Sequence, residues 1–246
     1  MKPSLQLFAL PGLPMVQAGD DLAVLLSAAM ARAGLTPQSG DVLAIAQKIV
    51  SKAEGRSVTL ASVEPSQAAR GLAEQTGKDA RLVELILSES EHVVRARPNL
   101  IIVKHRLGFV MANAGIDQSN VGDDGHALLL PRDPDVSASA LSARLGVPVV
   151  ITDSFGRAWR RGTVGVAIGA AGLPALRDLR GLPDLFGRTL MVSITGFADE
   201  IAAAAGLIMG QGAEGQPAVL LRGLTWSGAE NPAAELLRPA QEDLFQ

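Results

Sequence analysis

The 246-residue sequence contains no cysteine, and this absence removes several kinds of chemistry at once. Disulfide bonds, thiolate metal sites and cysteine nucleophiles are all excluded. Histidine is also scarce: the chain has His92, His105 and His126, and no pair has the HExxH spacing of a zinc site. We interpret His105 and His126 as surface or hydrogen-bonded loop residues. Any bound metal is therefore expected to have oxygen ligands.

The sequence also lacks long apolar runs and a strong excess of charge. No segment supplies the ~20 apolar residues that cross a bilayer, and the first residues show neither a sustained apolar stretch nor a small-residue cleavage site. The net charge is −3, so the overall balance favours neither nucleic acid nor an anionic membrane as a partner. We therefore expect a cytoplasmic protein.

Hydrophobic residues make up 48% of the chain, enough for a substantial core in one large domain or two smaller ones. Strands are expected at residues 4–10, 42–50, 100–103, 109–112, 148–152, 163–168, 190–194 and 218–221. Helices are expected at residues 22–33, with Asp20 or Asp21 as the N-cap, and at 65–75, 79–88, 136–145 and 197–209. Several strands form hairpin-like pairs, which favours an α+β chain, a mixed α/β arrangement with a mixed sheet and flanking helices.

Two segments share an arrangement in which an apolar, strand-like run opens into a turn with an aspartate and polar neighbours. LGFVMANAGIDQSNVG places Asp117 and Asn120 after residues 110–116, and VPVVITDSFGRAWRRG places Asp153 and Ser154 after residues 147–152. Carboxylates at strand ends suit a hard divalent cation. The second segment continues with guanidinium groups that suit a polyanion: Arg157, Arg160 and Arg161. Together these patterns indicate a metal and phosphate site.

A lysine-containing cluster, GDVLAIAQKIVSKAEGR, occupies residues 40–56. If residues 42–50 form a strand, Gln47, Lys48, Ser51 and Lys52 lie at or beyond its end, where open sheets commonly bind ligands. Lysine offers three donors to phosphate oxygens. For this spacing alone, however, a solvated strand end is the preferred interpretation.

The glycine-rich segments contain neither GxxxxGK[ST] nor an N-terminal GxGxxG after a strand. We interpret GVAIGAAG at residues 165–172 as a mark of tight packing. MGQGAEG at residues 209–215 offers amides to an anion and oxygens from Gln211 and Glu214, although a glycine C-cap with an ordinary loop explains it as well. Asp199 and Glu200 suit helix capping as well as catalysis. Trp159 suits stacking on a planar ligand or covering the core.

Taken in order, GLP, GDVLAIAQKIVSKAEGR, RLGFVMANAGIDQSNVG, ITDSFGRAWRRG, GRTL, ADEIAAAAGLIMG and RPAQEDLF closely resemble the family of coenzyme F420-0:L-glutamate ligases. The resemblance runs from about residue 13 to residue 245. It implies a GTP-dependent ligase that joins the amine of L-glutamate to a carboxylate of the deazaflavin F420-0, often adding a second glutamate by γ-linkage. It also implies an intertwined homodimer of two-domain α/β subunits that uses two divalent ions, Mg²⁺ or Mn²⁺, with K⁺ as a further candidate. We expect residues 1–246 to form one such ligase unit with two structural subdomains.

The resemblance also implies roles for individual residues. GTP contacts are expected from Leu13, Pro14, Met15, Val16, Gln47, Lys48, Lys52, Asn120, Gly210, Gln211, Gly212, Ala213 and Glu214. Metal ligands are expected to be Asp117, Asp153, Ser154 and Gln211, and catalytic residues Asp117, Asp153 and Arg157. Phosphoryl transfer to the acceptor carboxylate would create an acyl phosphate that the amine attacks. No side chain stands out as the general base for the amine.

The sequence departs from the family pattern in two places. GTVGVAIG stands where family members commonly have GQTDVAIG, and AAAAGLIMG replaces an AADL-type helix end. Both changes remove polar groups. Two alternatives therefore stay open: a ligase of the same family that acts on a different carboxylate, and a nucleotide- or phosphate-binding protein without turnover.

Overall fold

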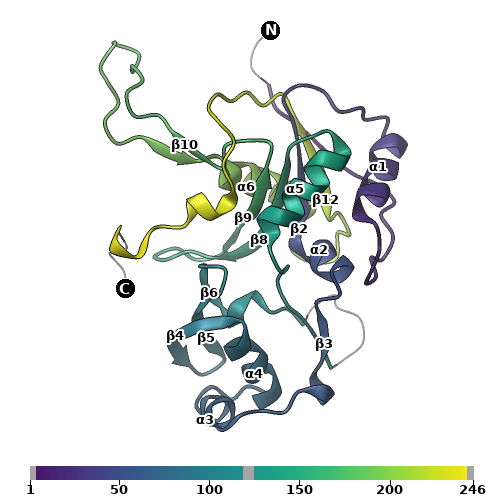
Figure 1. Cartoon of the computed structure of the whole chain (residues 1–246), viewed down its shortest axis with the longest axis vertical. Helices are drawn as coiled ribbons and strands as arrows, with labels where there is room; N and C mark the ends of the chain where they lie inside the picture. The colour runs from purple at the N-terminus through teal and green to yellow at the C-terminus, as the bar shows by residue number, and fades with distance from the viewer. Residues whose placement is uncertain (1–3, 119–124, 243–246) are drawn as a thin grey trace.

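A computed structural model describes residues 4–118 and 125–242 of the chain. Its centre is a five-stranded sheet in the order β1–β12–β2–β8–β9 (Figure 1). These strands are β1 (Gln6–Ala9), β12 (Ala218–Arg222), β2 (Asp41–Ala46), β8 (Val149–Gly156) and β9 (Thr163–Ala171). β2 and β8 pair in parallel, and the other three pairings are antiparallel. This arrangement confirms the predicted mixed sheet.

Helices cover both faces of this sheet. α1 (Leu22–Arg32) and α5 (Pro134–Leu145) pack on one face, and α6 (Phe197–Met209) packs on the other. Leu43 and Ile45 of β2 belong to the core beneath α1 and α5. Val42 and Ala44, which alternate with them, belong to the core beneath α6. Burial on both faces explains the unbroken apolar run in β2.

The described residues between 57 and 130 form a second body, the small lobe, below the sheet in Figure 1. Its helices are η1 (Leu60–Ser62), α3 (Gln67–Thr76), α4 (Ala80–Ser88) and η2 (Asn113–Gly115), and its strands are β3 (Ser57–Thr59), β4 (Ser90–Arg97), β5 (Leu100–His105), β6 (Val110–Ala112) and β7 (His126–Leu128). The small lobe has its own apolar core, in which Val83 and Ile86 of α4 pack with Ile101 and Val103 of β5. The remainder of the described chain is called the sheet lobe.

An arm extends from the sheet lobe between β9 and α6 (Figure 1). At its base β10 (Leu176–Asp178) pairs with β11 (Ile194–Gly196), and backbone hydrogen bonds continue outward as far as Asp184 and Arg188. The arm exposes large apolar side chains: Leu182, Leu185, Phe186, Met191 and Val192. After β12 the chain forms two short 3₁₀ helices, η3 (Ala233–Leu236) and η4 (Ala240–Glu242).

Six α-helices occur in the described residues, and α6 has the predicted bounds. Asp21 caps α1, as predicted, by accepting a hydrogen bond from the Val24 amide. None of the helices within residues 4–118 and 125–242 combines the length and apolarity needed to cross a membrane.

The strand predicted at residues 42–50 is wrong beyond Ala46, where the chain turns into α2 (Gln47–Ala53). Ile49 and Val50 are β-branched, but both are buried in the core on the α1 face, and this packing outweighs their weak preference for strands. The strand predicted at residues 190–194 is also wrong, because β11 begins only at Ile194. The arm backbone pairs across a narrow hairpin there and buries few of its apolar side chains.

The prediction that His105 lies at the surface or in a loop is wrong. His105 is fully buried at the end of β5, where its Nδ1 accepts a hydrogen bond from the Leu107 amide. His126 lies in β7, with Nε2 3.1 Å from Thr59 Oγ1. His105 lies on the buried face of the hydrophobic strand β5, so its side chain is in the core. Amino-acid composition alone does not reveal this burial.

The interpretation of GVAIGAAG as a packing segment is confirmed. A Cβ atom at Gly165 would lie 2.3 Å from the Ala202 carbonyl oxygen of α6, and one at Gly169 would lie 2.3 Å from the Pro134 carbonyl oxygen. Both glycines therefore let a helix backbone approach β9 closely. Gly165, the second glycine of the GTVG departure, therefore has a packing role against α6.

Candidate active site

Four segments meet at one edge of the central sheet. Ala46 pairs with Thr152 across the parallel strands β2 and β8, so the residues that follow both lie at the same end of this strand pair: α2 after β2, and Asp153 in the part of β8 that pairs only with β9. The segment before β12 reaches this edge because the Ala46 amide donates to the Pro217 carbonyl at 2.8 Å. The segment after β1 joins it through the Leu10 amide, which donates to the Ala218 carbonyl at 2.9 Å. We call this the ligand edge.

Lys48, in the first turn of α2, reaches from the ligand edge to the small lobe. Its Nζ lies 2.6 Å from Asp117 Oδ2, and the two side chains are 31% and 28% exposed. Asp117 is fixed by its backbone, which exchanges hydrogen bonds of 3.0 and 2.8 Å with Leu128. The strand predicted at residues 109–112 corresponds to β6, and the predicted small-residue turn before Asp117 corresponds to η2.

Asp153 lies within β8 rather than after the strand, which corrects its predicted position. Burial raises the pKa of its carboxyl to about 6, against a hydrogen bond from the Ser154 amide. The negative charge of Asp117 raises this pKa further, and the positive charge of Lys48 lowers it. Asp117 and Asp153 therefore place two carboxylates close to each other and to Lys48.

Ser154 faces the opposite side of β8, because successive side chains of a strand alternate. Its hydroxyl donates to Gln211 Oε1 at 2.6 Å. The loop that carries Gln211 folds back on itself, since the Gly212 amide donates to Glu214 Oε2 at 2.8 Å. At Gly210 φ is +70°, and a Cβ there would lie 2.1 Å from Glu214 Cδ, so this position requires glycine. Asp153 and Ser154, both predicted metal ligands, therefore lie on opposite faces of β8.

α2 carries the residues predicted to bind GTP after β2. Lys48 and Lys52 lie one turn apart and share a face of the helix. Burial and the positive charge of Lys48 lower the pKa of Lys52. Gln47 is only 2% exposed, and its Oε1 accepts a hydrogen bond from the Ser51 hydroxyl at 2.9 Å. Two closely spaced lysines therefore lie at the ligand edge, whereas the side chain of Gln47 is buried.

The loop after β1 lies beside α2. The Gly19 amide donates to the carbonyl of Ala53, the last residue of α2, at 2.9 Å. Val16 is buried in the same core as Ile49 and Val50, whereas Met15 is 72% exposed. The remaining predicted contacts of this loop are the half-buried Leu13 and the exposed Pro14.

The arginines after Asp153 lie in the exposed turn between β8 and β9. Arg157, Arg160 and Arg161 are all exposed, and Trp159 is 88% exposed with φ at +65°. A left-handed backbone at tryptophan is unusual and fixes a tight turn. Trp159 does not cover the core. Asn120 lies outside the described residues.

Several polar residues in the structure were not singled out by sequence reasoning. Arg56 and Glu89, both largely buried, form a charged cluster between the lobes together with the more exposed Arg106. They are far apart in sequence, and no spacing signals their contact. Asp199, left open between capping and catalysis, accepts a hydrogen bond from the Ala167 amide at 2.8 Å and so ties α6 to β9.

Sequence comparison places these features in a family. The sequence profile of F420-0:Gamma-glutamyl ligase matches residues 12–223. The chain belongs to this family. Among F420-0:gamma-glutamyl ligases, it is similar to the coenzyme F420:L-glutamate ligase of Methanothermobacter thermautotrophicus, with 46% identity over 98% of this chain and 99% of the relative. The same-named protein of Methanopyrus kandleri is 46% identical over 99% and 98% of the two chains, and that of Archaeoglobus fulgidus 44% over 98% and 96%.

The donor set of this F420-0:gamma-glutamyl ligase family member can be tested for its fit to a divalent ion. Across residues 4–118 and 125–242, no group of three or more histidine, aspartate and glutamate side chains is gathered to hold a metal. Asp117 and Asp153 nonetheless supply two carboxylates that are close enough to raise the pKa of Asp153. Mg²⁺ is typically held by one or two carboxylates together with substrate phosphates. The residues therefore fit an ion that nucleotide phosphates help to bind.

Proposed function

We propose that this protein is a GTP-dependent ligase that joins L-glutamate to the deazaflavin F420-0 during coenzyme F420 biosynthesis. Family membership and the names of the curated relatives support the ligase activity and its substrates. The observation that carries the proposal is the ligand edge, where Lys48, Asp117 and Asp153 meet beside Lys52. Basic and acidic side chains in this mixture suit a nucleotide triphosphate with a divalent cation.

The proposed reaction has two steps. An oxygen of the acceptor carboxylate attacks the γ-phosphorus of GTP, the bond to the β–γ bridging oxygen breaks, and GDP leaves. The glutamate amine then attacks the carbonyl carbon of the acyl phosphate, phosphate leaves, and the amine loses a proton as the amide forms. The first step turns a poor acyl donor into a good one, so the geometry must align acceptor and phosphate.

We assign the side chains at the ligand edge to the phosphates of GTP. Lys48 and Lys52 would donate hydrogen bonds to phosphate oxygens; burial, and then the positive charge of Lys48, lowers the pKa of Lys52. The loop of residues 210–214 would offer backbone amides from the opposite side of β8. Arg157, at the start of the exposed turn, would stabilise charge that develops during transfer. Residues 13–16 would border the nucleotide.

We assign Asp117 and Asp153 to divalent metal binding, with Ser154 and Gln211 as oxygen donors on the other face of β8. A bound Mg²⁺ or Mn²⁺ would supply Lewis-acid stabilisation of the phosphate oxygens. The division of donors between two faces favours two ion positions over one. Lys48 would orient Asp117 between turnovers.

We further infer a homodimer of two-subdomain chains. The arm supports this inference, because it leaves the sheet lobe and exposes several large apolar side chains, among them Leu185 at 99% and Phe186 at 84%. An exposed apolar set of this kind is typical of a protein interface.

The decisive experiment incubates the purified protein with GTP, Mn²⁺ or Mg²⁺, L-glutamate and F420-0. We expect GDP release and a mass gain of one glutamate on the deazaflavin. An authentic ligase serves as a parallel control for the acceptor. If the control works and this protein releases no GDP, the proposal fails. Turnover only with another carboxylate in an acceptor screen would identify a ligase of the same family with a different acceptor.

A further inference from the structure

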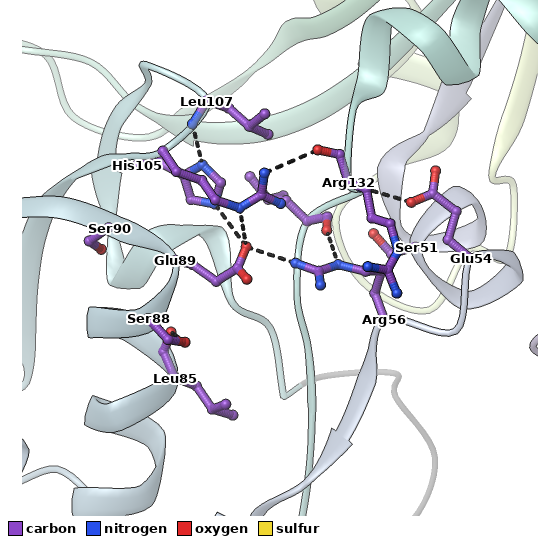
Figure 2. A network of polar contacts seen from close by, with 12 residues as sticks. Ser51, Glu54, Arg56, Leu85, Ser88, Glu89, Ser90, His105, Leu107 and Arg132 are labelled. Atoms are coloured by element: carbon purple, nitrogen blue, oxygen red, sulfur yellow. Dashed lines mark hydrogen bonds and ion pairs between the residues drawn. The ribbon is translucent and has the colours of Figure 1, made fainter. Parts of the chain in front are cut away.

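A charged cluster around the buried carboxylate of Glu89 joins the two lobes (Figure 2). Glu89 follows the last turn of α4, and its Oε2 accepts hydrogen bonds from Arg56 at 2.7 Å and from Arg106 Nε at 3.0 Å. The Nε2 of His105 lies 3.5 Å from the same oxygen. Glu89 is 8% exposed and His105 is fully buried. We call these four residues the Glu89 cluster.

Hydrogen bonds extend the Glu89 cluster to both chain segments that connect the lobes. Arg56, just after α2, donates through Nε to the Leu130 carbonyl at 2.8 Å, and its own carbonyl accepts from the Leu129 amide at 3.1 Å. Arg106 donates to the Arg132 carbonyl at 3.1 Å. The segment leaving the sheet lobe and the segment returning to it are therefore fixed to each other and to α4.

A second carboxylate carries these contacts onward into the sheet lobe. Glu54, at the end of α2, accepts from the Arg132 amide at 2.8 Å and from the Ser137 hydroxyl of α5 at 2.6 Å. The two carboxylates thus form one polar chain from α4 in the small lobe to α5 on the sheet. A buried arrangement with this many charged hydrogen bonds holds a defined orientation.

The two carboxylates of the proposed metal site come from different lobes. Asp153 lies in β8 of the sheet lobe, whereas Asp117 is bonded to Leu128 in the small lobe. Leu128 is two residues before Leu130, whose carbonyl receives Arg56. Any rotation of the small lobe about its connections would therefore change the separation of the two aspartates. The partly exposed ion pair between Lys48 and Asp117 is too weak alone to fix that separation.

We propose that the Glu89 cluster is a positioning device that holds Asp117 against Asp153 and so sets the affinity of the site for its divalent ion. Glu89 is a positioning residue and touches no substrate. The inference rests on the proposed metal site. Loss of the Glu89 charge would leave Arg56 and Arg106 facing each other without a counterion, and the small lobe would move to separate them.

Mn²⁺ binding tests this proposal without relying on turnover. Free Mn²⁺ is measured by electron paramagnetic resonance during titration of the protein with GTP present, and thermal unfolding is recorded on the same samples. We expect Glu89→Gln to raise the apparent Kd for Mn²⁺ by about tenfold or more, as substitutions that support metal ligands do. GTP consumption by this variant should recover at high Mn²⁺.

Glu64→Gln is the matched control, because it breaks an exposed ion pair with Arg70 in the same lobe, outside the cluster. Its Mn²⁺ affinity should equal that of the wild type.

If Glu89→Gln does not fold, Arg106→Gln replaces it, since the Arg106 side chain is 36% exposed and its loss leaves Glu89 paired with Arg56. A lower unfolding temperature with unchanged Mn²⁺ affinity would overturn the proposal. Absence of Mn²⁺ binding by the wild type would reject the metal site and this inference together.

Discussion

Lys48 Nζ and Asp117 Oδ2 lie 2.6 Å apart and connect the sheet lobe to the small lobe at the ligand edge. A partly exposed ion pair contributes roughly 0–1 kcal/mol to stability. Its position beside Asp153 gives it a different importance, because it places positive charge where a nucleotide phosphate would lie.

Lys48→Met should lower kcat/KM for GTP by about 100-fold, with less than about 1 kcal/mol lost from the free energy of unfolding. Steady-state kinetics and urea unfolding measure the two quantities. Lys104→Met is the control, because Lys104 pairs with Glu91 at 3.0 Å on the small lobe, away from the ligand edge. Equal kinetics in the two variants would contradict the assignment of Lys48.

Asp117→Asn and Asp153→Asn should each reduce metal-dependent GTP consumption by about 100-fold or more. Asp153→Asn should also raise the unfolding temperature of the metal-free protein, because it removes a poorly solvated charge next to Asp117. Scanning calorimetry checks the second effect. Glu91→Gln should change neither property. Unchanged turnover in both aspartate variants would remove them from the site.

Gly210→Ala should weaken nucleotide binding and destabilise the protein by roughly 1–3 kcal/mol, because the new Cβ meets Glu214 at a left-handed backbone position. Gly206→Ala lies four residues earlier in α6, where a Cβ meets nothing within 4 Å. It should stabilise the protein by about 0.5–1 kcal/mol. Thermal unfolding and GTP titration separate the two. If Gly210→Ala changed neither stability nor GTP binding, the loop would not need the left-handed backbone conformation at this position.

Glu89 should make stability depend on pH in acid. Burial alone would raise the pKa of Glu89, but contacts with His105, Arg56 and Arg106 outweigh it and lower the pKa from 4.5 to about 2. A depressed carboxyl pKa means that the stabilisation is present above pH 4.5 and is lost as pH falls towards 2. The destabilisation caused by Glu89→Gln should therefore shrink across this window in urea unfolding experiments.

Leu185→Asp with Phe186→Asp should convert the proposed dimer to a monomer, because charge at the exposed arm opposes apolar association. Light scattering after size-exclusion chromatography gives the mass. The fold should survive, since Leu185 and Phe186 are 99% and 84% exposed. A wild-type mass of one chain, about 25.5 kDa, would reject the dimer.

Strands of the main sheet followed from local apolar runs such as residues 218–221, and the start of α1 followed from its N-cap, Asp21. Both kinds of pattern act over a few residues. α2 did not follow from such patterns. Ile49 and Val50 resemble strand residues, and only the core on the α1 face shows that they belong to a helix. The strand predicted at residues 190–194 failed for the opposite reason, because apolar residues in the arm lie outside the core of the chain.

The sequence by itself determined the chemical inventory of this protein: no thiolate ligands, lysines after β2, two aspartate segments and a family resemblance that the comparisons confirm. The tertiary structure alone decided which of these groups meet. Parallel pairing of β2 with β8 brings Lys48 to Asp153, and docking of the small lobe brings Asp117 to Lys48. The Glu89 cluster joins residues as far apart as Arg56 and Arg106, because the buried carboxylate of Glu89 needs cationic partners wherever they lie in the chain.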